Sequence, residues 1–453
     1  PDVAMYSAVA SACDQVHRWT FALQMLSLAR EEDRAEGMSR RPTTPMNSVK
    51  PKWRVKPPEK DRVQIAQSGA PQYKDSFIPA GCDDDEDAAR YEQVITRGHW
   101  CPPRLRGRND LLIEAVNDWH FAMLNDSHRN QFYWDALGRC VKDKCVVDIG
   151  SGSGLLALMA LKLGARKVIA IEASQDMVDL ARLNAERNGA ERLQIIHGLS
   201  SKVHLNDCKA DVIVSETLGA LMLGEGMLDY MADARLRLGQ ADCLVVPRGG
   251  AQFAQLVASE SLAMVSSVQT QCSLGFDLSA IGCLQDTGKI FFSKQWGFRL
   301  NTLNDLVGMS ERICIFEADF QNGDRRDIPA IQNFKLRATR PGVIHAVMAS
   351  WEVWSDEAKT HKITTHPEDT KDQPWGFARD MQWGQGLQLI EDFDAANRAG
   401  SREDAPSPFI VQEGEELLLT VRMSLPCRQT FQHFGRAKKG EEGLRDAHEI
   451  PNA

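Results

Sequence analysis

The sequence predicts an α/β domain with a parallel, doubly wound sheet, followed by an antiparallel β domain. The first domain is predicted by a glycine-rich turn at 150–154 that follows an apolar strand, 145–149, and by a second apolar strand at 167–171. The second domain is predicted by the alternation of apolar and polar residues after Pro247. These two patterns place a domain boundary near residue 246.

The elements of the first domain are predicted one by one from apolar periodicity. Helices and strands alternate in the order that builds a parallel sheet, and one helix closes at Asn188-Gly189, a common helix stop. The predicted elements are, in order, a helical stretch over about 119–137, a strand at 145–149, a helix at 154–163, a strand at 167–171, a helix at 175–188, and strands near 193–196 and 211–214. We assign residues 109–246 to this domain.

Residues 247–436 are assigned to the antiparallel domain. Its strands are predicted where the alternation is clearest, at 252–257, 334–337, 342–353 and 417–423. A helical insertion around 262–281 interrupts the strands and belongs to an arm that we place at about 262–310. Residues 437–453 are predicted to be a polar tail.

Two further segments precede these domains. Residues 1–35 carry apolar side chains at helical spacing, which predicts a helical hairpin, and they resemble one unit of a pentatricopeptide array. A single repeat cannot bury its own apolar face, so either an array is truncated at Pro1 or the segment is an ordinary hairpin. Residues 36–108 combine proline-rich basic stretches with the acidic run 83–87, a pattern typical of a solvated linker; contact with RNA or a nuclear signal is the alternative.

Composition favours an intracellular enzyme of more than one domain. The 453 residues suffice for two or three domains, and 43% of them are hydrophobic. The net charge of −9 argues against general affinity for nucleic acid or acidic membranes. We therefore expect nucleic acid to bind, if at all, only through the N-terminal hairpin. The negative charge also suits a cationic substrate. No apolar run approaches the roughly 18 to 20 residues that cross a bilayer, and no membrane partner is expected.

The eleven cysteines are scattered along the chain without a C-x-x-C pair. We therefore expect no zinc site and a reducing compartment. This predicts a location in the cytoplasm and/or the nucleus. An organelle stays open, because the chain begins with Pro1 rather than Met.

The glycine-rich turn indicates a cofactor. A strand, a glycine-rich turn, a helix and a second strand ending in Glu172 form a βαβ nucleotide site, where the acid takes the ribose hydroxyls. The turn reads G-x-G-x-G, whereas the dinucleotide fingerprint requires glycine where Leu155 stands. Asp148, just before the turn, repels phosphate and attracts an ammonium group. S-adenosylmethionine has a ribose, a cationic amino group and no phosphate, and is the predicted cofactor; a nicotinamide enzyme or a turn without a ligand are the alternatives.

A second motif lies directly after the strand at 211–214, where residues 215–228 contain Glu216 and Glu225 among apolar and glycine residues. Ligands of open α/β sheets bind beyond the carboxyl ends of the strands, so this loop overhangs the cofactor pocket. Two carboxylates in a poorly hydrated loop repel each other, which raises the pKa of one of them unless a cation lies between them. A planar guanidinium suits that position. The alternative is an ordinary loop carboxylate and an acid at a helix start.

Residues 215–228 resemble the double-glutamate loop of the protein arginine methyltransferases, in which the two acids have the same nine-residue separation. The resemblance extends over about residues 117–436. Its further matches are the cofactor-covering helix at 120–126 with Arg129 after it, a dimerisation-arm segment at 275–281, and the Thr-His-Trp loop of the family's β-barrel at 381–385, with Glu391-Asp392 beyond it. The resemblance implies a Rossmann-like methyltransferase domain, an antiparallel β-barrel with a helical dimerisation arm, and a homodimer.

The resemblance also implies an activity and a role for each matching residue. The activity is transfer of methyl groups from S-adenosylmethionine to arginine in protein substrates, such as histones or RNA-binding proteins, without a metal. The implied cofactor-binding residues are Met123 beside the transferring methyl, Arg129 on the cofactor carboxylate, Asp148 with Gly150, Gly152 and Gly154 around the methionine moiety, and Glu172 on the ribose. The implied catalytic residues are Glu216 and Glu225, which bind the substrate guanidinium, and the implied substrate loop contains Gln382 and Trp383.

Departures from the family's pattern resemble its divergent branch, related to arginine methyltransferases 7 and 9. The aromatic motif expected upstream of His120 is absent, Thr217 replaces a usual tryptophan, and Gln382 replaces the histidine of the substrate loop. Ser201 lies where many members place an adenine-contacting glutamate. The type of methylated product therefore stays open. Two alternative functions stay open as well: methyl transfer to another acceptor such as RNA, and a non-catalytic scaffold, against which the retention of both acids speaks.

Overall fold

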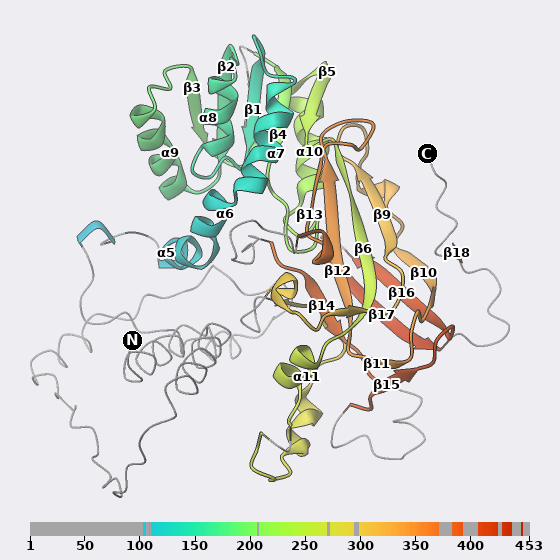
Figure 1. Ribbon diagram of the computed structural model, residues 1–453. Coiled ribbons are helices and arrows are strands. Elements are labelled where there is room, and N and C mark those ends of the chain that lie inside the picture. The colour runs from blue at the N-terminus through green and yellow to red at the C-terminus, as the bar shows by residue number, and fades with distance from the viewer. Residues whose placement is uncertain are drawn as a thin grey trace, which may run out of the picture. The chain divides into compact units, whose positions relative to one another are not determined.

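The computed structural model in Figure 1 describes residues 103–105, 108, 110–205, 208–269, 272–293, 299–370, 383–392, 406–424, 428–436 and 445–446. The chain divides into two compact units, Pro1–Asn117 and Asp118–Ala453. The predicted hairpin of residues 1–35 and most of the predicted linker lie outside the described residues. Of the first unit the structure describes the short turn η1 (Pro103–Leu105), the helix α5 (Asp110–Ala115) and the beginning of η2 (Val116–His120).

A five-stranded parallel sheet forms the first half of the second unit, in the order β3-β2-β1-β4-β5. Its strands are β1 (Cys145–Ile149), β2 (Lys167–Glu172), β3 (Leu193–His197), β4 (Ala210–Ser215) and β5 (Gly239–Val246). Every residue of the central strand β1 is buried, which explains why all of them except Asp148 are apolar. The strand order reverses between β1 and β4, so this sheet has a topological switch point at their carboxyl ends.

Helices precede the first strand and connect the later ones, as predicted. They are α6 (Phe121–Asn125), α7 (Ser127–Gly138), α8 (Leu155–Lys162), α9 (Gln175–Arg187) and α10 (Met227–Arg237), with the short turn η3 (Ser200–Lys202). The side chain of Ser174 caps α9, and Gly189, with a φ of 59°, follows its end, which confirms the predicted helix stop. The single helical stretch predicted over 119–137 is wrong in one respect. Asp126 is extended, with a ψ of 92°, and its side chain caps α7, so the helix breaks there.

The second half of the unit is antiparallel, as predicted, apart from one short parallel pair between residues 334–335 and 445–446. A seven-stranded sheet contains β6 (Gly249–Ala258), β7 (Phe291–Phe292), β8 (Val307–Gly308), β9 (Ile313–Asp319), β12 (Ala346–Trp354), β13 (Lys362–Thr364) and β14 (Gly386–Leu389). The other strands are β10 (Ile331–Arg337), β16 (Glu416–Ser424), β17 (Arg428–Arg436) and β18 (Arg445–Asp446) in one sheet, and β11 (Gly342–Ile344) and β15 (Phe409–Val411) in another. The strand predicted over 342–353 is divided at His345, whose backbone N–H donates to Val257. Closure of these sheets into a barrel stays a prediction.

One hydrophobic core joins the two halves of the second unit. It contains Val147 and Ile213 of the parallel sheet, Leu218 and Met222 of the acid loop, and Trp351 of the antiparallel sheet. The acid loop, which we define as residues 215–228, therefore lies where the two kinds of sheet pack together. Short turns complete the fold: η4 (Ser279–Leu284), η6 (Leu300–Thr302), η7 (Arg325–Asp327) and η8 (Glu368–Thr370). Among the described residues no helix is both long and apolar enough to span a bilayer.

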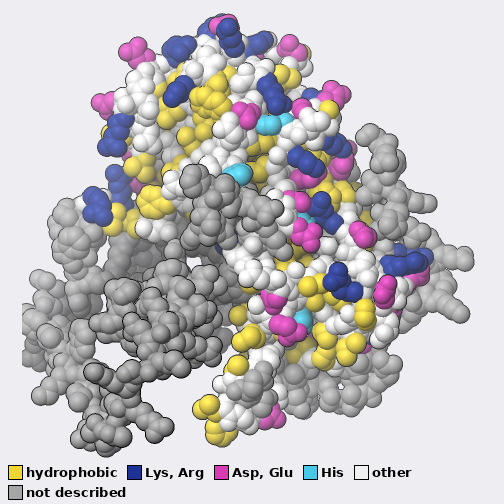
Figure 2. All heavy atoms as spheres, viewed as in Figure 1, with side chains coloured by type: hydrophobic (Ala, Val, Ile, Leu, Met, Phe, Trp, Pro, Cys, Tyr) yellow, Lys and Arg dark blue, Asp and Glu magenta, His cyan; other side chains and the backbone are white. Residues whose placement is uncertain are grey.

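The predicted arm projects from the antiparallel sheets (Figure 1). Only part of the insertion predicted around 262–281 is helical, in α11 (Glu260–Ser266) and in η4. Hydrophobic side chains gather on this projection in Figure 2, and the most exposed are Leu274, Leu284 and Phe276, at 88%, 78% and 68% exposure. Apolar side chains so exposed mark a surface that is suited to contact with another protein.

Candidate active site

The candidate site lies at the carboxyl ends of three neighbouring parallel strands. Ile149 of β1 pairs with Ile171 of β2 on one side and with Ser215 of β4 on the other. The glycine turn, Glu172 and Glu216 each follow one of these strand ends, so they lie close together although they are distant in sequence. The Ser215 hydroxyl also donates to the Ile149 carbonyl at 2.8 Å, which ties β4 to β1 beside the turn.

The glycine turn has the backbone that its sequence requires. Gly150, Gly152 and Gly154 have φ values of 67°, 52° and 85°, in the left-handed region that favours glycine. A Cβ atom on Gly150 would also lie 3.1 Å from the Thr217 methyl group, so that glycine is needed for close packing as well. The amides of Gly150 and Ser151 donate to the carbonyl of Ile171, at 2.9 and 3.1 Å. These bonds fix the turn against the end of β2.

Glu172 accepts two backbone hydrogen bonds that fix the orientation of its carboxylate. The amide of Gly152 donates to Oε2 and the amide of Ser174 donates to Oε1, both at 2.8 Å. One bond comes from the glycine turn and the other from the start of α9. Each carboxylate oxygen can accept a further hydrogen bond, so this acid can receive a pair of hydroxyl groups, as a ribose presents them.

Asp148 is a buried acid with one oxygen unused among the described residues. The residue is 1% exposed, and Oδ2 accepts a hydrogen bond from the Ala157 amide at 3.1 Å. Its Oδ1 is buried and has no partner in the described part of the chain, and the same holds for the Ser151 hydroxyl. Burial, reinforced by the charge of Glu172, raises the pKa of Asp148 to about 7. A buried acceptor without a partner is costly, and an ammonium group placed against it would remove that cost.

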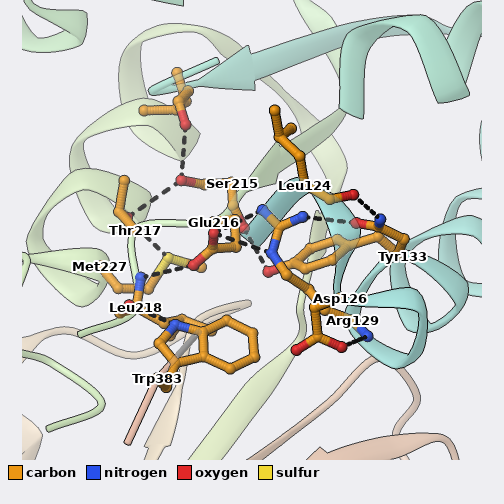
Figure 3. A network of polar contacts seen from close by, with 12 residues as sticks. Leu124, Asp126, Arg129, Tyr133, Ser215, Glu216, Thr217, Leu218, Met227 and Trp383 are labelled. Atoms are coloured by element: carbon orange, nitrogen blue, oxygen red, sulfur yellow. Dashed lines mark hydrogen bonds and ion pairs between the residues drawn. The ribbon is translucent and has the colours of Figure 1, made fainter. Parts of the chain in front are cut away.

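Glu216 is paired with the arginine that was predicted to bind the cofactor (Figure 3). Arg129 Nη2 and Nε donate to Glu216 Oε2 at 2.6 and 3.2 Å, and the two side chains are only 4% and 5% exposed. Burial alone would lower the pKa of Arg129, but the adjacent Glu216 charge outweighs it and the pKa is raised. The Tyr133 hydroxyl donates to the Ser215 carbonyl at 3.1 Å, which anchors α7 to the same strand end. Arg129 therefore fixes the orientation of the Glu216 carboxylate.

Glu225 is the second acid of the loop and lies directly before α10. Its pKa is raised to about 8, by desolvation and by the negative charge of Glu216. Glu225 as a whole residue is exposed, which leaves it accessible to a bound cation. Such a cation would relieve the repulsion by Glu216 and so lower the raised pKa of Glu225. The structure thus brings the two acids within electrostatic reach of each other, at the position that the sequence predicts.

The other predicted site residues are placed as follows. Met123 is buried in α6, and its carbonyl accepts the Asp126 amide. Trp383 is buried, and its indole N–H donates to the Leu218 carbonyl of the acid loop at 2.8 Å (Figure 3). Gln382 lies outside the described residues.

His120 is a site residue that the sequence reasoning did not single out. It is buried, and its ring carbon Cε1 lies 3.8 Å from the position of a Cβ on Gly152. Burial and the charge of Arg129 lower the pKa of His120, so its imidazole is neutral near pH 7. The available signal was its position three residues before Met123, which puts both side chains on one side of the helical segment.

Fold and site together place the chain in the class of Rossmann-like α/β proteins, with an added antiparallel domain. Residues 134–227 match the family model described as ribosomal protein L11 methyltransferase (PrmA). Within that class, protein arginine N-methyltransferase 7 of Oryza sativa subsp. japonica is 31% identical over 265 residues, which are 54% of this chain and 36% of that protein. Protein arginine N-methyltransferase 1 of Schizosaccharomyces pombe is 27% identical over 288 residues, 61% of this chain and 78% of that protein.

Solved structures share the fold. The Trypanosoma brucei PRMT1 enzyme-prozyme heterotetrameric complex with AdoHcy has a TM-score of 0.52 at 23% identity, covering 70% of this chain and 98% of that one. Arabidopsis thaliana protein arginine methyltransferase 10 has a TM-score of 0.51 at 19% identity, covering 70% and 96%. The chain is therefore similar to protein arginine N-methyltransferases over 54–61% of its length, and it shares their fold. It spans less than two fifths of the length of the methyltransferases 7 that it matches.

Proposed function

We propose that this chain transfers a methyl group from S-adenosylmethionine to the guanidinium of arginine in protein substrates. The observation that carries the proposal is the acid loop, in which Glu216 and Glu225 come within electrostatic reach of each other beside the glycine turn. Glu216 raises the pKa of Glu225, and a cation held between the two acids would relieve that repulsion. The similarity to proteins named protein arginine N-methyltransferase supports the same activity.

The residues of the turn fit S-adenosylmethionine group by group. Asp148 Oδ1 would accept the amino group, Glu172 would take the ribose hydroxyls, and the buried cation Arg129 lies close enough to Asp148 to affect its pKa and would face the carboxylate. His120, neutral beside Gly152, would close the same pocket. When bound, the cofactor supplies an electrophilic methyl group on its sulfonium. The protein holds the cofactor in place and excludes water around the reacting atoms.

The acid loop would act on the substrate guanidinium. Glu216, oriented by Arg129, would bind one side of the guanidinium, and Glu225 would bind another. Both acids draw positive charge toward the nitrogens that they hold, which leaves electron density on the nitrogen that faces the methyl group. Glu225, whose pKa is raised by desolvation and by the charge of Glu216, would accept the proton that the methylated nitrogen loses.

We further propose that two copies of the chain associate through the arm. The support is the apolar surface of the arm, where Leu274, Phe276 and Leu284 are each more than two thirds exposed. Such a contact joins the arm of one copy to the α/β sheet of the other and closes with two subunits. The similar Trypanosoma brucei protein forms an enzyme-prozyme heterotetramer, so assembly occurs in a protein of this fold.

The test is mass spectrometry after incubation with isotope-labelled S-adenosylmethionine and either arginine-rich peptides or RNA of matched length. The proposal expects label on arginine of the peptides and none on RNA, and the product masses would distinguish mono- from dimethylation. Label on RNA alone would replace the proposal by the other acceptor. Cofactor binding without transfer to either would favour a scaffold.

A further inference from the structure

The acid loop is held by the antiparallel sheet as well as by the parallel sheet from which it emerges. Three hydrogen bonds connect the segment 218–222 to side chains of the antiparallel half. The Trp351 indole N–H donates to the Gly219 carbonyl at 3.0 Å, and the Trp383 indole N–H donates to the Leu218 carbonyl at 2.8 Å. The Met222 amide donates to Gln252 Oε1 at 2.9 Å. The segment between the two acids is therefore fixed at three residues, Leu218, Gly219 and Met222.

Two of these side chains form one unit on neighbouring strands. Trp351 of β12 lies directly opposite Gln252 of β6 in the antiparallel register, and neither residue has any solvent exposure. The Gln252 amide also donates to the Ser350 carbonyl at 2.8 Å, so both ends of its amide are bonded and it cannot rotate without losing one bond. Trp351 packs edge-on against Trp383, with ring centroids 4.8 Å apart and planes at 71°. The whole unit is rigid and closed to water.

The loop's own backbone hydrogen bonds lie next to its second acid, from the Gly224 amide to the Leu221 carbonyl at 2.8 Å and from the Gly226 amide to the Leu223 carbonyl at 3.0 Å. Gly219 and Gly224 lie between the two acids and give the chain conformational freedom. Glu216 is anchored at its end by Arg129, whereas Glu225 is the acid with the raised pKa and is repelled by Glu216. Without fixed carbonyls at Leu218 and Gly219, this repulsion would move the two carboxylates apart.

We propose that Trp351 and Gln252 are positioning residues for the substrate guanidinium. They fix the segment 219–222 so that Glu216 and Glu225, which flank it, face one cation between them. The inference rests on the proposed function only for the identity of that cation. The positioning itself is a property of the loop and can be measured without methyl transfer.

The experiment removes the indole N–H of Trp351 and keeps the packing of its ring against Trp383. Trp351 is replaced by β-(3-benzothienyl)alanine, in which sulfur takes the place of the indole N–H, and by Phe as a simpler variant. Trp354→Phe is the matched control, because Trp354 is a buried tryptophan of the same strand that lies against Gly249 and Lys359 instead of the loop. Gln252→Met removes both amide bonds at nearly constant volume. Gln252→Glu is the conservative rescue, since a neutral carboxyl can still accept from Met222 and donate to Ser350.

Three quantities are measured on the full chain: hydrogen exchange of the amides of residues 216–225, the Kd of S-adenosylmethionine, and kcat and KM for an arginine peptide. The proposal expects at least tenfold faster exchange across the loop in both Trp351 variants and in Gln252→Met. It expects kcat/KM to fall about 10- to 100-fold, because the loss of the hydrogen bond also misplaces the two acids. The Kd of the cofactor should stay within about twofold of wild type. Trp354→Phe should leave loop exchange unchanged, and Gln252→Glu should recover part of the lost kcat/KM.

Unchanged loop exchange in the benzothienyl variant would overturn the positioning role, whatever happens to the activity. Equal exchange in the Trp351 and Trp354 variants would overturn it too, because that result would reflect general destabilisation. If the wild-type protein methylates no arginine but the Trp351 variants still exchange faster, the positioning role stands and the proposed function fails.

Discussion

Replacement of Arg129 by Met tests whether this arginine supports the acid loop. The substitution keeps most of the apolar volume of the side chain but leaves Glu216, at 5% exposure, without its two hydrogen bonds of 2.6 and 3.2 Å. Removing one partner of a buried ion pair costs about 3–5 kcal/mol, because the other charge stays buried without compensation. For a cooperative unit of about 340 residues, with an unfolding entropy of about 2.1 cal/mol/K per residue, this lowers Tm by about 4–7 °C.

The pH dependence of that loss separates it from a packing defect. In Arg129→Met the buried Glu216 should have a raised pKa, so the variant binds more protons when folded than when unfolded. Its stability is then highest below the unfolded pKa of glutamate and falls as the pH rises through the raised folded value. The difference from wild type should be small at pH 5 and grow toward pH 8. The assay is calorimetric unfolding across this range, with Arg139→Met as the control, since Arg139 is 55% exposed and 3.9 Å from Asp356. A difference in Tm that is independent of pH would refute the assigned ion pair.

Three further predictions follow from the site and the arm. Glu172→Ala should weaken binding of S-adenosylmethionine by about 1.5–3 kcal/mol, roughly ten- to a hundredfold by titration calorimetry, and unchanged affinity would exclude its ribose role. Because the pKa of Glu225 is raised to about 8 and the charged form binds a cation, kcat/KM should fall as the pH drops below about 8; a flat profile from pH 6 to 9 would contradict this. The double variant Leu274→Glu/Leu284→Glu should be a monomer when its mass is measured by light scattering. The control Leu236→Glu changes a residue of α10 that is 81% exposed and should leave the dimer intact. A monomeric wild-type protein would contradict the proposed dimer.

Local patterns predicted the part of the site that local backbone geometry determines. The three glycines have left-handed φ values because a tight turn must follow β1, and the acids follow strand ends because the parallel order brings those ends together. The break at Asp126 was missed because apolar spacing continues across it, while the capping bond to the Arg129 amide depends on the backbone conformation.

Contacts between residues distant in sequence could not be predicted. Nothing in the sequence indicates that Arg129 pairs with Glu216. The pairing depends on how α7 packs over the end of β4. Trp351 and Gln252 looked like ordinary residues of alternating strands. Only the antiparallel register places them opposite each other and under the acid loop. Long-range pairing of this kind is determined by tertiary packing, not by the periodicity of either strand.

The central claim is that Glu216 and Glu225 together hold an arginine guanidinium, and Glu225→Gln tests it most directly. The substitution keeps the size of the side chain and removes one charge of the pair. The measurement is the methylation rate of an arginine peptide, followed by mass spectrometry, with the Kd of S-adenosylmethionine determined on the same samples. The account predicts a loss of about 3–5 kcal/mol, some two to four orders of magnitude in kcat/KM, with the cofactor Kd unchanged. Methylation of arginine by Glu225→Gln at the wild-type rate would contradict the account.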